Sequence, residues 1–230
     1  MKKLINILLA KKGYEIRKIS NRSILSSLIL ERSKKKDFIF MQIGANDGVS
    51  FDPIHELVKV FNLRGILLEP VPHHFNSLKK NYNENKDLIF LNKALVDHDS
   101  IKSIIIWKPK LNYNDWRKGI ASTDKNHLIK CGLLDEEIEG IEVETTTFVK
   151  LFDEFKIKKL DLLVVDTEGY DFFLLKSLPF DNFSPAIIHF EHNVYGQNGM
   201  SKEELLDLLN ILISRGYKLN IDSTDCTAYL

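Results

Sequence analysis

The chain has 230 residues, of which 44% are hydrophobic and 28% are charged, and its formal net charge at pH 7 is zero. This is the balance of one soluble globular domain with a sizeable core, and the zero net charge argues against a nucleic-acid partner. The two cysteines, Cys131 and Cys226, lie far apart without metal or redox spacing, which indicates reduced thiols in a cytoplasmic protein.

Positive charge is concentrated at the N-terminus. Residues 1–36 hold eleven Lys and Arg against two Glu, a net of +9, so the rest of the chain carries −9. Apolar residues at helical spacing predict that this is a basic helical segment, followed by a domain over residues 37–230. Such a segment is most simply a solvated helical cap, because charge runs are usually just solvated; it also leaves room for peripheral contact with an anionic membrane or an acidic glycan.

The next stretch combines a strand, a glycine loop and a helix. Residues 38–43 are almost all apolar, which predicts a strand buried on both faces. Gly44 and Gly48 follow, and Asp52 and Pro53 suit the N-cap and first position of a helix over about 53–62. This order is typical of the first unit of a nucleotide-binding α/β sheet.

Further strands and helices alternate along the rest of the chain. Strands are predicted over residues 64–69, 88–91, 103–107, 141–148, 160–165 and 185–191. Helices are predicted over residues 73–83, 151–155, from about 171 to 178, and after a capping box of Ser201 and Glu204 as far as Gly216. Residues 217–221 and 227–230 predict a closing antiparallel pair. Residues 108–140 lack a clear period, which indicates a substrate lid or binding loop.

Polar residues follow four of the predicted strands, in the segments Gly44–Gly48, Glu69, Asp166–Glu168 and Glu191–Asn193. The carboxyl ends of parallel strands meet at one edge of a sheet, and ligands bind there. Glu69 lies 25 positions after Gly44, which suits a carboxylate that binds a ribose hydroxyl. The loop lacks a G-x-G-x-x-G pattern and its Asp47 would repel a pyrophosphate, so we expect S-adenosylmethionine rather than a dinucleotide.

Four short motifs together resemble those of the FkbM family of S-adenosylmethionine-dependent methyltransferases. They are Ile43-Gly-Ala-Asn-Asp-Gly48, Leu68-Glu-Pro70, Asn92-Lys-Ala94 and Val165-Asp-Thr-Glu-Gly-Tyr-Asp171. The resemblance covers roughly residues 38–192, and Val164 stands where the family commonly has a lysine. It implies an α/β, Rossmann-like class I methyltransferase fold. That fold has a mostly parallel seven-stranded sheet, helices on both faces and an antiparallel last strand.

The same resemblance implies how the cofactor would bind. Its methionine end would lie over the glycine loop, with Asp47 beside it, Glu69 on the ribose hydroxyls and Asn92 to Ala94 at the adenine edge. The cofactor-binding residues expected are Gly44, Asn46, Asp47, Gly48, Glu69, Pro70, Asn92, Ala94 and Asp166. Family members typically methylate hydroxyls, often on sugars of polysaccharides, glycolipids or natural products. We therefore expect a glycan or small-molecule acceptor, although related enzymes also use amines and carboxyls.

A sugar hydroxyl is a poor nucleophile at neutral pH, so a general base is expected beside it. The candidates are Asp166, which directly ends an apolar strand, Glu191, and His192, whose side-chain type ionises nearest to neutral pH. A divalent metal held by Asp166 with Glu191 or His192 would be another way to activate the hydroxyl, but no helix-spaced ligand pair supports it.

Two other functions stay open at this point. One is a nicotinamide-dependent oxidoreductase, against which the missing G-x-G-x-x-G and Asp47 both count. The other is a non-catalytic module that keeps the Rossmann-like fold as a binder or scaffold. The intact glycine loop, Glu69 and Asp166 speak against lost cofactor binding, but they do not exclude lost catalysis.

Overall fold

The computed structural model describes residues 23–34, 37–110, 116–193 and 199–230. Most of the basic segment predicted over residues 1–36 therefore lies outside the described residues. Its described part contains helix α2 (Ile24–Arg32), as the apolar spacing predicted. The hydroxyl of Ser23 caps this helix by accepting a hydrogen bond from the N–H of Ser26 at 3.1 Å.

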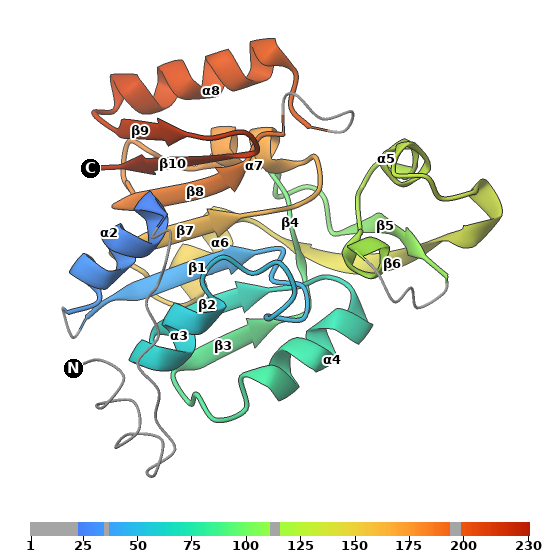
Figure 1. Cartoon of the computed structure of the whole chain (residues 1–230), viewed down its shortest axis with the longest axis horizontal. Helices are drawn as coiled ribbons and strands as arrows, with labels where there is room; N and C mark the ends of the chain where they lie inside the picture. The colour runs from blue at the N-terminus through green and yellow to red at the C-terminus, as the bar shows by residue number, and fades with distance from the viewer. Residues whose placement is uncertain (1–22, 35–36, 111–115, 194–198) are drawn as a thin grey trace, which may run out of the picture.

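The centre of the molecule is a seven-stranded sheet with the strand order β3-β2-β1-β7-β8-β10-β9 (Figure 1). Its strands are β1 (Ile39–Ile43), β2 (Arg64–Leu68), β3 (Leu88–Leu91), β7 (Leu162–Val165), β8 (Ile187–Glu191), β9 (Lys218–Ile221) and β10 (Asp225–Tyr229). Every pairing is parallel except those of β10, which runs antiparallel to both neighbours. The predicted Rossmann-like fold with an antiparallel last strand is confirmed.

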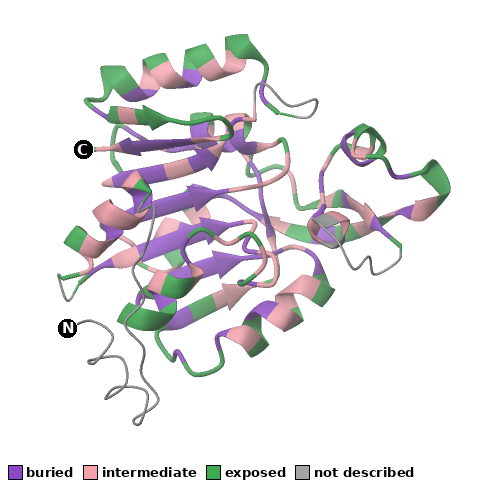
Figure 2. Cartoon of the chain, in the orientation of Figure 1, coloured by how far each residue is buried: buried purple, intermediate pink, exposed green. Residues whose placement is uncertain are grey.

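Helices cover both faces of this sheet. One face carries α2, α3 (His55–Phe61) and α4 (Pro72–Asn81), and the other carries α6 (Phe148–Glu154), α7 (Asp171–Ser177) and α8 (Lys202–Ser214). Phe40 of β1 packs into the core between the sheet and α2, α3 and α4. Met41 and Ile43 of the same strand pack into the core on the opposite face, against α6, α7 and α8. Because the central strands are buried on both faces, their sequences are mainly apolar, with Gln42 as a buried polar exception in β1 (Figure 2). None of the helices in the described ranges is long and apolar enough to cross a membrane.

Two helix starts follow the signals in the sequence. Ser201 and Glu204 form the predicted capping box of α8, with hydrogen bonds of 3.1 and 2.8 Å in the two directions. Asp52 accepts hydrogen bonds from the N–H groups of Ile54 and His55 at 2.8 and 3.1 Å. Asp52 therefore anchors α3, although the helix itself begins at His55, two residues later than predicted.

A second, three-stranded sheet lies beyond the carboxyl edge of the large one (Figure 1). It consists of β4 (Ala94–Leu95), β5 (Ser103–Pro109) and β6 (Ile138–Thr146). Between β5 and β6 come the short helices η1 (Trp116–Gly119), α5 (Lys125–Lys130) and η2 (Asp135–Glu137). We call the described part of this connection, residues 116–137, the insert. The sequence pattern indicated neither β4 nor these helices, and the role of residues 108–140 as a lid stays a prediction.

Candidate functional site

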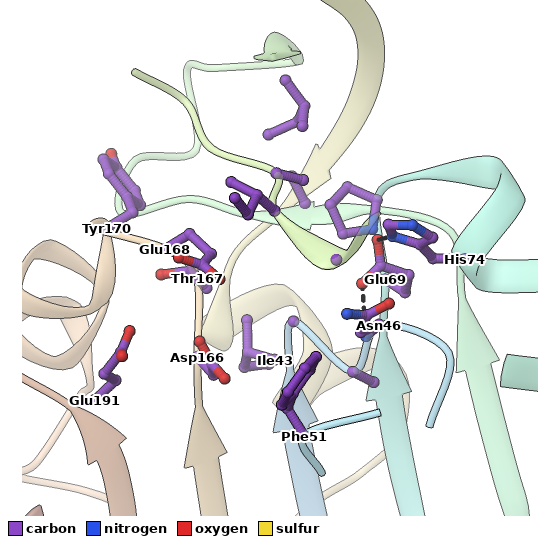
Figure 3. Close-up of a pocket in the computed structure, with 18 of the residues that line it drawn as sticks. Ile43, Asn46, Phe51, Glu69, His74, Asp166, Thr167, Glu168, Tyr170 and Glu191 are labelled. Atoms are coloured by element: carbon purple, nitrogen blue, oxygen red, sulfur yellow. Dashed lines mark hydrogen bonds and ion pairs between the residues drawn. The ribbon is translucent and has the colours of Figure 1, made fainter. Parts of the chain in front are cut away.

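A cavity of about 640 Å³ opens at the carboxyl edge of the large sheet. Its volume lies within the range of small-molecule sites. The structure brings all four predicted strand tips to its wall, through Gly44 and Asn46, Glu69, Asp166 to Glu168, and Glu191. Figure 3 shows Asn46, Glu69 and His74 at one end of the cavity and Asp166, Glu168 and Glu191 at the other. We call these the glycine-loop end and the acidic end.

Glu69 dominates the glycine-loop end. Its side chain is buried, and its two oxygens accept hydrogen bonds from the N–H groups of Asn46 and Val71, each at 2.8 Å. The ring of His74 also lines the cavity, with Nδ1 3.9 Å from Glu69 Oε1. Burial raises the pKa of Glu69 to about 7, since the two N–H donors and the nearby charge of Asp47 have smaller effects. Glu69 thus joins the loops after β1 and β2 and presents a carboxyl group to the cavity.

Pro70 and Ala94 also line the cavity, whereas three other residues expected to bind the cofactor do not. Asp47 turns back into its own loop, where Oδ1 accepts hydrogen bonds from the N–H groups of Val49 and Ser50 at 2.9 and 2.6 Å. Gly48 packs against α4, and Asn92 donates to the main-chain oxygens of Glu69 and Pro70 at 2.8 and 3.0 Å. These three residues shape the loops, and their direct contact with a cofactor stays a prediction.

Asp166 and Glu191 form part of the acidic end. Burial, together with the negative charges of Asp171 and Glu168, raises the pKa of Asp166 well above its usual range. Burial, together with the charges of Glu168 and Asp171, raises the pKa of Glu191 to about 8. Glu191 therefore keeps its proton at neutral pH, and burial likewise favours the neutral form of Asp166. A neutral carboxyl group is able to donate a hydrogen bond and is a poor base.

His192, the third predicted base, lies behind the tip of β8. Its side chain is buried, and Nε2 lies 3.2 Å from the main-chain oxygen of Asp222. It is not among the residues that line the cavity, so its catalytic role stays a prediction that this geometry does not favour. Across the described part of the chain, no group of three or more His, Cys, Asp or Glu side chains is arranged to hold a metal ion.

The insert supplies two residues that contact the loop after β7. Nε2 of His127 lies 3.0 Å from Oε2 of Glu168, and the hydroxyl of Ser122 donates to the main-chain oxygen of Glu168 at 2.8 Å. The sequence analysis did not select His127 or Glu168 as site residues. Glu168 stood inside a quoted motif, but nothing local marks His127, which precedes Glu168 by 41 positions.

The insert also covers the glycine loop. A Cβ atom on Gly119 would lie 2.7 Å from the side-chain nitrogen of Asn46, so the two segments are in close contact. Apolar side chains of β5 and the insert face the same cavity, namely Ile104, Ile106, Ile120 and Ala121. At its mouth lies Phe51, which is 72% exposed and has a φ of 60°. The cavity thus has a polar floor of strand tips and a largely apolar cover.

Comparisons with known proteins identify the family of this chain. A family model described as the Methyltransferase FkbM domain matches residues 42–219, about three quarters of the chain. No curated protein matches the sequence.

Several solved structures are similar over most of the chain. They include the METTL16 MTase domain (10% identity, 99% of this chain and 78% of that chain, TM-score 0.47). A Staphylococcus aureus protein described as a caffeoyl-CoA O-methyltransferase gives 10% identity, 99% and 90% coverage and a TM-score of 0.49. The precorrin-6y C5,15-methyltransferase of Geobacter metallireducens has 9% sequence identity and a TM-score of 0.42, and the match covers 95% of this chain and 95% of that chain. Scores this low carry no argument about activity, which rests on the family model.

Proposed function

The chain belongs to the FkbM family of S-adenosylmethionine-dependent methyltransferases, and we propose that it methylates a sugar hydroxyl. The product would belong to the biosynthesis of a polysaccharide, a glycolipid or a natural product. The observation that carries the proposal is the buried carboxyl of Glu69 beside the glycine loop, in a cavity whose opposite end is lined by acids. The family assignment removes the support for a nicotinamide-dependent oxidoreductase.

The residues around the cavity fit S-adenosylmethionine. Glu69 would accept hydrogen bonds from the ribose hydroxyls, and Gly44 and Asn46 would lie against the methionine end. Gln42 lines the cavity too, and its buried Oε1 has no hydrogen-bond donor in the described part of the protein. A ligand that carries N–H or O–H groups would satisfy this oxygen. The bound cofactor supplies a methyl group on a positively charged sulfur, which is already activated for transfer.

The acidic end fits an acceptor that carries several hydroxyl groups. The neutral carboxyls of Asp166 and Glu191 would each offer a donor and an acceptor, which is what orienting a sugar requires. Alignment of the acceptor oxygen with the methyl carbon is then the main contribution of the protein. The apolar side chains of the insert would exclude water from the reacting atoms.

Further parts of the proposal rest on the sequence. We place the reaction in the cytoplasm, with a glycan or a small molecule as the acceptor and without a nucleic-acid partner. The basic charge of residues 1–36 supports peripheral contact with a membrane or an acidic glycan. The assignment of the acceptor to a hydroxyl rather than an amine rests on the typical substrates of the family.

Two measurements test this function. Calorimetry should show micromolar binding of S-adenosylmethionine and S-adenosylhomocysteine, and none of oxidised nicotinamide dinucleotide. Labelled methyl groups should then pass from S-adenosylmethionine to at least one member of a panel of nucleotide sugars and glycans. If the protein binds the cofactor and transfers methyl groups to amines but not to sugars, the acceptor is an amine and not a sugar hydroxyl. Absence of binding by both sulfur compounds would favour the non-catalytic scaffold instead.

A further inference from the structure

We propose that Glu168 is the group that takes the proton of the methyl acceptor, and that His127 of the insert holds its side chain in position. This inference rests on the proposed function, since it assigns a role at the acceptor end of the same cavity. Glu168 is not one of the general bases expected from the sequence, which were Asp166, Glu191 and His192. The proposal also assigns a role in the reaction to the insert, which contains His127.

The side chains of the two residues have the arrangement that the roles require. Nε2 of His127 and Oε2 of Glu168 are 3.0 Å apart, and both residues line the cavity. The His127 side chain is 8% exposed and that of Glu168 is 36% exposed, so the carboxylate is the member of the pair that a ligand can reach. Among the described residues, no donor meets Oε1 of Glu168, which leaves this oxygen to accept a proton.

The main chain at Glu168 is held in a conformation that side chains seldom adopt. Its φ is 53°, in the left-handed region. Asp171 accepts hydrogen bonds from the N–H and hydroxyl of Thr167 at 3.1 and 2.7 Å, and Ser122 donates to the main-chain oxygen of Glu168. Strained residues persist where the surroundings fix them, and they cluster at active sites. The loop and the insert thus act together to aim one carboxylate.

The neighbouring acids are poorly suited to the same task. Asp166 and Glu191 both have a raised pKa, and the negative charge of Glu168 is one of the causes in each case. Their neutral forms donate hydrogen bonds and accept protons weakly. His192 does not line the cavity. Glu168 is therefore the carboxylate of the acidic end that faces the cavity and is paired with a histidine.

The step balances in atoms and charge. The acceptor oxygen forms a bond to the methyl carbon as its proton passes to Oε1 of Glu168. The carbon–sulfur bond breaks, its electron pair stays on sulfur, and the sulfonium becomes a neutral thioether. Glu168 then releases the proton to water at the cavity mouth. In this proposal His127 serves as a hydrogen-bond donor from Nε2 to Oε2 and takes no part in the proton transfer, which makes it a positioning residue.

A pair of cofactor analogues tests the proposal without knowledge of the acceptor. Sinefungin carries an amine-bearing carbon in place of the methyl-bearing sulfur, so its ammonium group occupies the position of the transferred methyl, next to the place of the acceptor oxygen and its base. S-adenosylhomocysteine has no group there. The ratio of the two affinities, measured by calorimetry at pH 7, therefore reports a carboxylate beside the transferred methyl. A charge-assisted hydrogen bond predicts that sinefungin binds more tightly than S-adenosylhomocysteine by about tenfold or more.

The variants separate the proposed roles. Glu168→Gln should lower the ratio about tenfold and leave S-adenosylhomocysteine binding within about twofold of the unchanged protein. His127→Phe should lower the ratio as well, because the phenyl ring has no N–H group to donate to Glu168. His127→Gln should restore most of the ratio, because its side-chain amide can donate that hydrogen bond. Asn126→Ala, an exposed change on the same helix, is the matched control and should leave the ratio unchanged.

Three results would overturn the inference. The first is an unaltered ratio in Glu168→Gln with normal binding of S-adenosylhomocysteine. The second is a fall in the ratio in Glu191→Gln instead, which would assign the proton to Glu191. The third is a normal ratio in His127→Phe, which would remove the positioning role. Failure of the unchanged protein to bind either analogue would contradict the proposed function itself, and is recognised by the absence of any S-adenosylhomocysteine signal.

Discussion

A Cβ atom on Gly44 would lie 1.7 Å from the main-chain oxygen of Asp166, so the tips of β1 and β7 touch through this glycine. Gly44 also has a φ of 78°, which disfavours any side chain. We expect Gly44→Ala to destabilise the protein by about 3 kcal/mol or more, because the main-chain oxygen of Asp166, directly after the central strand β7, would have to move. Urea unfolding of the two proteins measures this difference.

Gly132→Ala is the control for the Gly44 prediction. Gly132 also has a positive φ, of 89°, but no atom lies within 4 Å of the Cβ position. This change should therefore destabilise by only about 1 kcal/mol, through the conformation alone. Equal losses in the two variants would show that the contact between the strand tips has no energetic weight.

Glu69→Gln should weaken the binding of S-adenosylhomocysteine by about tenfold or more. The two carboxyl oxygens of Glu69 now accept hydrogen bonds from the N–H groups of Asn46 and Val71. The glutamine amide has only one oxygen, so its NH2 group would face one of these two N–H donors and that hydrogen bond would be lost. Calorimetry measures the effect, and the exposed change Glu56→Gln on α3 serves as a control that should leave the affinity unchanged.

The ionisation of Glu69 gives the same site a pH dependence. With a pKa of about 7, its carboxylate form, which accepts hydrogen bonds from ribose hydroxyls more strongly, becomes dominant above neutral pH. The affinity for S-adenosylhomocysteine should therefore rise between pH 6 and pH 8. The rise should be smaller in Glu69→Gln, and a rise of the same size in both proteins would assign it to another group.

Glu191→Gln should change how stability depends on pH. The pKa of Glu191 is about 8 in the folded protein, above its ordinary value of 4.5, so the native state keeps a proton that the unfolded chain releases. Its stabilising effect is complete below pH 4.5 and is lost as the pH rises toward 8. Because glutamine resembles the neutral acid, the variant should lose less stability than the unchanged protein between pH 5 and pH 8. The difference should be about 1–3 kcal/mol.

Urea midpoints at the two pH values measure the effect of Glu191. An equivalent change at an exposed site, Glu84→Gln, should leave the pH dependence as it is. If Glu191→Gln shows the same slope as the unchanged protein, Glu191 releases its proton in the folded state as readily as in the unfolded chain.

Phe51 at the cavity mouth permits a test of main-chain strain. Its φ is 60° although it carries a large side chain, and most of that side chain is exposed. Phe51→Gly and Phe51→Ala remove the same ring, but only the alanine keeps a Cβ atom in the left-handed region. We expect the glycine variant to be more stable by about 1 kcal/mol in urea unfolding. The reverse order, which is usual at ordinary main-chain angles, would show that the strain is absent in solution.

The sequence was sufficient to predict the large sheet because its strands carry a strong and local signal. Strands such as β1 and β7 are buried on both faces, so their residues are apolar apart from Gln42 in β1, and a glycine or a carboxylate follows each strand. The tip residues Gly44, Glu69 and Asp166 could be grouped because parallel strands share a carboxyl edge.

The insert could not be read in the same way, for two physical reasons. Its elements are short, since β4 has two residues and α5 has six, so neither shows a period. Its link to the site is also non-local, because His127 and Glu168 are 41 positions apart in the sequence. Asp47 illustrates a further difficulty: a carboxylate in a loop serves equally well as a ligand contact or as the acceptor for the N–H groups two and three residues later.

The order of strands in the large sheet has a consequence for the growing chain. β1 pairs with β7, and the N–H of Ile39 bonds to the carboxylate of Asp161, which follows it by 122 positions. On the ribosome, the edge of β1 that β7 covers therefore stays open until that later segment emerges. At ordinary translation speeds this interval is roughly 6 to 25 seconds. Through that time an apolar strand has an unpaired edge, so we expect the nascent chain to depend on chaperones more than the finished protein does.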